Sequence, residues 1–268
     1  SMAKQLEGIE CVLTYKDVKQ ISYTRAGQGY PEPSPYDTHL LGEKVRFVGD
    51  TVALVAGKDL KTVKKALKLI RVEYEVLEPV LDFEHSMDEG APIIHDQDDT
   101  VNIYDASRNL AQHYDMCIGD VDEIIENSDI QIERAYYYPK AQQVPLENHT
   151  AFSYYDDKER LVVVSSTQVP FHARRILSHI LEIPIRNIRV IKPRIGGGFG
   201  AKQGVIIEGY CGLVTVKTGK PSILVYDRKE TFINTYTRHD MRVTVRIGAD
   251  KEGKVKAIDM HALSNTGA

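Results

Sequence analysis

Apolar residues recur at three- and four-residue steps in three segments, and this spacing predicts three helices. The first covers residues 60–70, where Asp59 can cap the N-terminus and lysines occupy the opposite face. The second covers residues 170–181 and begins with a proline, which suits the first position of a helix. The third, residues 205–218, is mostly apolar and is followed by Gly219, a residue typical of helix C-termini.

Short β-rich runs, several with strict alternation, predict strands between and around these helices. They cover residues 45–48, 52–56, 71–76, 130–133, 150–155, 161–166, 188–191, 222–226, 241–247 and 255–260. Gly49-Asp50 is a tight-turn signal that predicts a hairpin between the first two runs. Turns at 156–158 and 250–253 predict two further hairpins. The mixture indicates an α+β fold.

A polar, weakly periodic stretch at residues 84–118 divides the chain into two α+β units. We interpret it as a linker that crosses a surface. The predicted first unit, with this linker, covers residues 3–100, and the second covers residues 119–268.

Composition excludes several classes of protein. The chain has 34 basic and 38 acidic residues, a net charge of −4 that argues against nucleic-acid binding. No apolar run approaches the roughly 20 residues needed to span a membrane. Three dispersed cysteines cannot hold a four-thiolate iron–sulfur cluster and favour a reducing cytoplasm. Both ends of the sequence look cut, so we expect a fragment of a longer protein.

Four glycines in the five positions 196–200 form the most unusual local pattern of the chain. Such a run permits close approach of a ligand, and before a helix N-terminus it suits an anion. A structural turn is the alternative. A P-loop would need Ser or Thr after Lys202, where Gln203 stands, and a dinucleotide site would need an acidic residue nearer than Asp227.

The motif Ser166-Thr167-Gln168, followed after a helix by the run GGGFGAK at 196–202, resembles the molybdenum-binding subunit of the xanthine dehydrogenase and aldehyde oxidase family. The resemblance is strongest to bacterial xanthine dehydrogenases. Supporting matches lie at 119–120, 146–147, 227–230, 237–239 and 263–268. Residues 41–56 and 72–75 are similar to the family's hammerhead domain. The resemblance implies a truncated hammerhead domain followed by part of the first molybdopterin-binding domain.

This resemblance also implies roles for individual residues. Gln168 would hydrogen-bond an oxo ligand of molybdenum, and Gln168 and Phe199 would lie beside the metal. The residues that pack against the molybdopterin would be Gly197, Gly198, Phe199 and Gly200. Gln203 takes the place of a glutamate that contacts purine in animal-type enzymes, and it keeps a hydrogen-bonding group without the charge.

The implied parent enzyme hydroxylates a purine (xanthine or hypoxanthine) or a related N-heterocycle with oxygen from water. Its electrons pass to 2Fe–2S clusters and FAD on partner subunits. The general base, a glutamate, would lie after Ala268 with the rest of the molybdenum subunit, so we expect the isolated chain to be inactive. Aldehyde, nicotinate and carbon monoxide dehydrogenase and 4-hydroxybenzoyl-CoA reductase remain alternatives within the family. A non-catalytic phosphate- or nucleotide-binding module is the alternative outside it.

Other polar residues have simpler interpretations. His149, His172 and His179 lack the spacing of a metal triad and are interpreted as ordinary polar or capping histidines. Glu147 is interpreted as a buried structural carboxylate with a hydrogen-bonded partner. The tyrosines at 136–138 fit a strand that buries alternate side chains.

Overall fold

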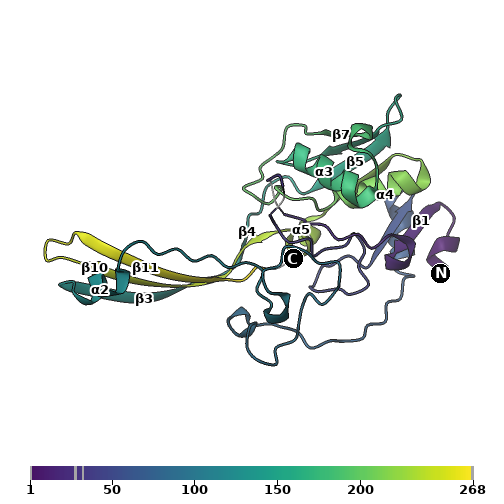
Figure 1. The fold of residues 1–268 in the computed structure, drawn as a ribbon. Helices are drawn as coiled ribbons and strands as arrows, with labels where there is room; N and C mark the ends of the chain where they lie inside the picture. The colour runs from purple at the N-terminus through teal and green to yellow at the C-terminus, as the bar shows by residue number, and fades with distance from the viewer. Residues whose placement is uncertain (1, 27–28, 32, 267–268) are drawn as a thin grey trace.

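A four-stranded mixed sheet forms the centre of the main body of the molecule, as the computed structural model of residues 2–26, 29–31 and 33–266 shows (Figure 1). Its strands are β5 (Thr150–Tyr155), β6 (Leu161–Ser165), β7 (Ile188–Ile191) and β8 (Ser222–Val225), in the order β7-β6-β5-β8. The predicted hairpin between β5 and β6 is confirmed, and β7 runs parallel to β6.

Two helices cover this sheet and contribute to its core. α3 (Pro170–Leu181) is the crossover between the parallel strands β6 and β7, and α4 (Glu208–Thr218) packs against α3 and β5. The predicted N-terminal proline of α3 and the Gly219 cap of α4, with φ of +69°, are confirmed. α4 begins three residues later than the predicted start at 205.

The first part of the chain forms a two-stranded sheet with one helix beside it. β1 (Ile9–Thr14) pairs with β2 (Ala53–Gly57), and α1 (Leu60–Leu67) packs against β2, with Asp59 capping it as predicted. The predicted hairpin between 45–48 and 52–56 is wrong, because residues 45–48 form no strand and β2 pairs with β1, about forty residues earlier. The predicted strand at 71–76 is also wrong, since this exposed stretch has no ladder partner within the described residues.

One hydrophobic core joins the two predicted units. Leu13, Tyr23 and Leu41 from the first part lie in the same cluster as Leu161 and Leu177 from the second. The body therefore packs as one mass around the four-stranded sheet. The α+β class is confirmed, and the division at 84–118 stays a prediction.

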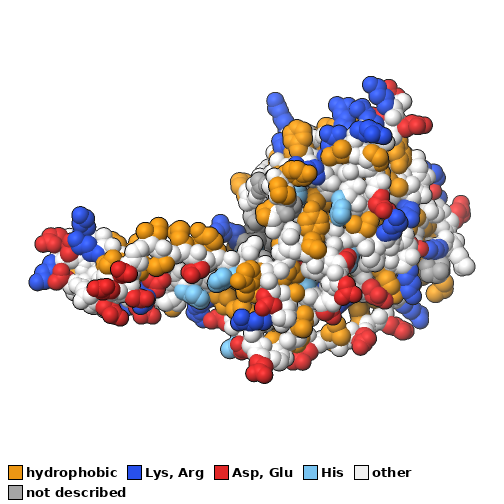
Figure 2. Space-filling model, viewed as in Figure 1, with side chains coloured by type: hydrophobic (Ala, Val, Ile, Leu, Met, Phe, Trp, Pro, Cys, Tyr) orange, Lys and Arg blue, Asp and Glu red, His pale blue; other side chains and the backbone are white. Residues whose placement is uncertain are grey.

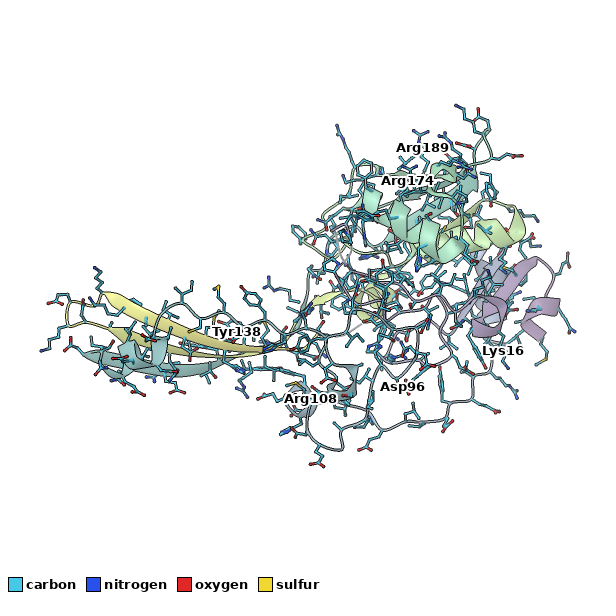
Figure 3. All side chains as sticks on the ribbon, in the orientation of Figure 1. Lys16, Asp96, Arg108, Tyr138, Arg174 and Arg189 are labelled. Atoms are coloured by element: carbon cyan, nitrogen blue, oxygen red, sulfur yellow. The ribbon has the colours of Figure 1, made fainter. Side chains whose placement is uncertain are left out.

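Three long antiparallel strands leave the body as an arm (Figure 1). They are β3 (Ile130–Tyr138), β10 (Met241–Ala249) and β11 (Val255–Ser264), in the order β11-β10-β3, with α2 (Val121–Glu126) packed on them. Tyr138 lies where the arm joins the body (Figure 3). The tyrosines at 136–138 do form a strand, but all three are 48–55% exposed, so the predicted burial of alternate rings is wrong.

Short elements complete the chain. They are β4 (Ala141–Gln142), paired with β9 (Thr237–Arg238), α5 (Arg228–Asn234), and 3-10 turns at Met2–Gln5, Tyr15–Asp17, Phe83–His85, Ala106–Arg108 and Ile185–Asn187. In the described ranges, none of the helices has the length and apolar character needed to cross a bilayer.

Candidate functional site at the glycine loop

The glycine-rich residues 196–200 lie on a loop between β7 and α4, beside the residues that follow β6 and precede β5. The loop does not cap a helix as predicted, because residues 201–207 form turns before α4 begins. A helix dipole is therefore not aimed at this loop.

Gln168 is fixed by the backbone that follows the glycines. Its Oε1 accepts hydrogen bonds from the N–H of Gly200, at 3.2 Å, and of Lys202, at 3.3 Å. Its own backbone N–H donates to the Lys202 carbonyl at 2.7 Å. Because both backbone groups are donors, the side-chain oxygen must face them, which leaves Nε2 as the outward-facing donor. Nε2 has no acceptor among the described residues.

Gly198 is needed because the Gln168 amide lies directly against its α-carbon. A Cβ at position 198 would lie 2.6 Å from Cδ of Gln168, well inside van der Waals contact. Gly197 and Gly200 have φ of +92° and +93°, which glycine adopts without strain. The glycine-rich sequence is thus explained by the fit to Gln168 and by the path of the backbone.

Phe199 stands out within the loop. It has a φ of +53°, a conformation that is costly for a bulky residue, and its side chain is 74% exposed. Residues held in such rare backbone conformations cluster at active and ligand-binding sites. The N–H groups of Gly197, Gly198 and Phe199 find no acceptor within the described ranges, so they form a run of free donors on the loop.

Glu147 and Lys202 form an ion pair across the two ends of the loop. Oε2 of Glu147 lies 2.8 Å from Nζ of Lys202 and also accepts the N–H of Gly196 at 2.8 Å. Burial acts to raise the pKa of Glu147, but the hydrogen bonds from Lys202 and Gly196 outweigh it and hold the pKa below its ordinary value. Glu147 has the predicted bonded partner, although its side chain is 36% exposed rather than buried.

The histidines take ordinary structural positions. The ring Nε2 of His149 bonds to the carbonyl of Ala201 at 2.9 Å, and burial lowers its pKa, so the ring is neutral. His179 bonds to the carbonyl of Ser22. No group of three His, Cys, Asp or Glu side chains that could hold a metal ion occurs in the described part of the chain. The donors at the loop are amide N–H groups, which suit the acceptor atoms of an organic ligand.

Gln203 lies on the same loop as the predicted cofactor contacts. Its backbone N–H donates to the Gly200 carbonyl at 3.2 Å, and its Oε1 would lie 3.9 Å from a Cβ at position 200. Gln168 and Gln203 therefore both lie next to Gly200. The structure brings all the predicted site residues together, and their roles stay predictions.

Two contributions were not predicted from the sequence. One is the pairing of Lys202 with Glu147, whose partners lie 55 residues apart. The other is Arg228, whose Nη2 donates to the Leu146 carbonyl at 3.0 Å and anchors the segment that carries Glu147. Both residues stand inside motifs quoted for the family resemblance, but no local spacing indicates their partners.

Known families match almost the whole chain. Residues 100–268 match the molybdopterin cofactor-binding domain, and residues 1–78 match the aldehyde oxidase and xanthine dehydrogenase a/b hammerhead domain. The chain belongs to the aldehyde oxidase and xanthine dehydrogenase family. Its fold is a hammerhead domain with part of the molybdopterin-binding domain, as the resemblance predicted, and its cofactor is molybdenum-molybdopterin.

Individual relatives within this family are long proteins. The chain is 40% identical to a probable hypoxanthine oxidase of Escherichia coli O157:H7, over 100% of the chain and 31% of that protein. It is 32% identical to the nicotinate dehydrogenase large molybdopterin subunit of Eubacterium barkeri, over 100% of the chain and 59% of that protein. A solved structure of a carbon monoxide dehydrogenase from Oligotropha carboxidovorans superimposes with a TM-score of 0.80 at 28% identity. The superposition covers 97% of this chain and 33% of that one. The chain thus spans about a third of the first of these relatives.

Proposed function

We propose that this chain is part of a molybdenum hydroxylase subunit that oxidises a purine, such as xanthine or hypoxanthine, or a related N-heterocycle. The observation that carries the proposal is the orientation of Gln168. Its oxygen is held by the backbone N–H groups of Gly200 and Lys202, so Nε2 is left as a donor with no acceptor among the described residues. A neutral N–H donor beside a glycine loop fits an oxo group on a cofactor, because it stabilises the oxygen without adding charge.

The molybdenum-molybdopterin group, when bound, supplies oxidation of an electron-poor carbon with oxygen derived from water. The chain's own residues hold and orient that group. Gln168 would donate from Nε2, the N–H groups of residues 197–199 would offer hydrogen bonds, and Gly198, without a side chain, leaves room for the Gln168 amide. The exposed Phe199 ring would add an apolar surface beside that group.

Gln203 is the residue that we assign to the substrate. Its amide both donates and accepts, which matches the ring nitrogens and carbonyl groups of a purine or another N-heterocycle. The similarity to a probable hypoxanthine oxidase and to a nicotinate dehydrogenase supports a heterocyclic substrate.

The remaining machinery belongs to other parts of the enzyme. We assign the general base to the rest of the molybdenum subunit, and the FAD and 2Fe–2S clusters to partner subunits in the cytoplasm. The isolated chain, which spans about a third of its relative in Escherichia coli O157:H7, is then inactive.

A phosphate-binding module is disfavoured by the loop geometry. The N–H groups of Gly196, Gly200 and Lys202 are already used by side chains of the protein. The ammonium of Lys202 is also taken up by its ion pair with Glu147, so it is not available to a phosphate.

The test is the molybdenum and pterin content of the full-length subunit, purified with its partners, alongside Gln168→Ala and Gly198→Val variants. We expect stoichiometric molybdenum in the parent, a clear loss in Gly198→Val, and a lower turnover per molybdenum in Gln168→Ala. A parent without molybdenum, under conditions that load a known molybdoenzyme, would refute the proposal. Tight nucleotide binding that Gly198→Val abolishes would then favour the phosphate-binding module.

A further inference from the structure

We propose that Glu147 and Lys202 are positioning residues, which close the glycine loop and thereby aim Nε2 of Gln168 at the cofactor. This inference rests on the proposed function, since it concerns the same site. Neither residue needs to touch the cofactor for this role.

A single carboxylate oxygen ties the two ends of the loop together. Oε2 of Glu147 accepts the backbone N–H of Gly196, where the loop begins, and the ammonium of Lys202, which follows the loop. Both distances are 2.8 Å. Charge-assisted hydrogen bonds of this length are among the strong ones in proteins, so the loop is held shut at its base.

Lys202 connects this closure to Gln168. Its backbone N–H donates to Oε1 of Gln168, and its carbonyl accepts the backbone N–H of Gln168 at 2.7 Å. A shift of Lys202 therefore moves both the backbone and the side-chain amide of Gln168. The ion pair acts on the cofactor donor through this short chain of bonds.

The two partners differ in burial, so the loss of one partner has a different cost from the loss of the other. The side chain of Lys202 is fully buried, whereas that of Glu147 is 36% exposed. An unpaired ammonium in this position would be costly, while an unpaired carboxylate could be solvated. Glu147 is itself anchored by its N–H bond to the Gly196 carbonyl, at 3.2 Å, and by the Arg228 bond to Leu146.

The experiment compares Glu147→Gln, Lys202→Met and the double variant in the full-length enzyme with its partner subunits. It measures molybdenum and pterin per polypeptide, the pentavalent molybdenum paramagnetic resonance spectrum, and kcat and KM per bound molybdenum. The control is Glu208→Gln, which removes a buried carboxylate that bonds Ser165 and the N–H of Ile206 and makes no bond to residues 196–202. Melting temperatures of the cofactor-free proteins are measured in parallel.

We expect Glu147→Gln to lower cofactor content or kcat per molybdenum by about tenfold, as lost supporting contacts do at metal sites, with an altered resonance spectrum. KM should change far less. Adding Lys202→Met should restore part of the loss, since no buried charge is then left unpaired. Glu208→Gln should lower only the melting temperature, leaving kcat and the spectrum per molybdenum unchanged.

Unchanged spectra and kcat per molybdenum in both single variants would overturn the inference while leaving the proposed function intact. The inference is also overturned if the loss of cofactor is proportional to the drop in melting temperature in every variant, including Glu208→Gln. A parent enzyme that carries no molybdenum would overturn the proposed function, and this inference with it.

Discussion

The contact between Gly198 and Gln168 is tight enough to be tested with single and double substitutions of the two residues. We predict that Gly198→Ala lowers the free energy of unfolding by about 1–3 kcal/mol, because the new methyl overlaps the Gln168 amide. In a Gln168→Ala background the overlapping atoms are gone, so the same change should cost less than about 0.5 kcal/mol. Denaturant unfolding of the four proteins measures both values, and equal costs in the two backgrounds would contradict the contact.

His95 gives the protein a pH-dependent stability. Burial, with Arg46 and Lys44 nearby, lowers its pKa from 6.5 to about 4, and its neighbour Asp37 lies 4.0 Å away with a pKa that burial raises. The unfolded chain therefore takes up a proton that the folded chain does not. Stability is fully present above pH 6.5 and falls towards pH 4, by about 3 kcal/mol.

Denaturation midpoints of the parent and of His95→Gln, measured between pH 4 and 7.5, test this prediction. In His95→Gln the stability should fall less steeply as the pH is lowered. His85→Gln is the control with the opposite pH dependence, because the hydrogen bond that the ring of exposed His85 donates to Asp88 raises the pKa of this histidine. His85 therefore stabilises only at low pH. An unchanged slope in His95→Gln would show that another group causes the decline.

At the level of residues, the sequence predicted the donors of the site but not the contacts that position them. Gln168 and residues 197–200 follow from a recognisable order of motifs. The pairing of Glu147 with Lys202 depends on how β5, β6 and the loop come together, and nothing within either motif encodes it. The strain at Phe199 is likewise a product of the folded backbone.

α2 is an element whose existence depends on packing. A six-residue helix is unstable alone, and this one is held to the arm by buried Ile125, by an Asp122–Arg246 ion pair and by the absence of a side chain at Gly248. A Cβ at 248 would lie 3.0 Å from Cα of Ile125. We predict that Gly248→Ala pushes α2 away and speeds amide exchange in residues 121–128 by about tenfold.

Hydrogen exchange followed by mass spectrometry measures this effect. Thr244→Val, on the same face of β10 but four residues from Gly248, is the matched control and should leave these amides unchanged. Equal protection in Gly248→Ala and the parent would mean that α2 does not rest on β10 in solution.

Helices and strands were predicted well where the hydrophobic pattern of the element itself is long. They were predicted poorly where a distant strand or helix determines whether the element forms. α3 and the hairpin of β5 and β6 each carry a clear hydrophobic periodicity in their own residues, so the sequence predicted them. Residues 45–48 and 71–76 alternate like strands, but no ladder partner reaches them among the described residues. β1 was missed because its apolar run is short and its partner β2 is distant. α2 is too short to show a helical period.

On the scale of the whole molecule, the arm has one polar and one apolar face. Strand register places Glu133, Arg246 and Asp259 on one side and Ile132, Ile247 and Ile258 on the other. α2 lies against the polar side, at Gly248. The individual strands were predicted, but their separation from the body was not, because local alternation does not reveal which face is covered.

The apolar face of the arm, made of the residues that share a side with Ile132, Ile247 and Ile258, is open in this chain. Ile132, Ile258 and Met260 are 46%, 57% and 66% exposed, and Figure 2 shows a row of hydrophobic side chains along the arm. Exposed, contiguous apolar surface of this kind binds hydrophobic dyes and mediates association.

We therefore predict that the 268-residue chain binds anilinonaphthalene sulfonate in its folded state, and that Ile258→Thr with Met260→Thr lowers the dye fluorescence about twofold. These side chains are exposed, so the melting temperature should hardly change. His261→Ser, next to Met260 but on the polar face, should leave the fluorescence unaltered, because neighbouring residues of a strand point to opposite sides. Equal fluorescence in all three proteins would show that this face is covered in solution, and the dye would then report on another surface.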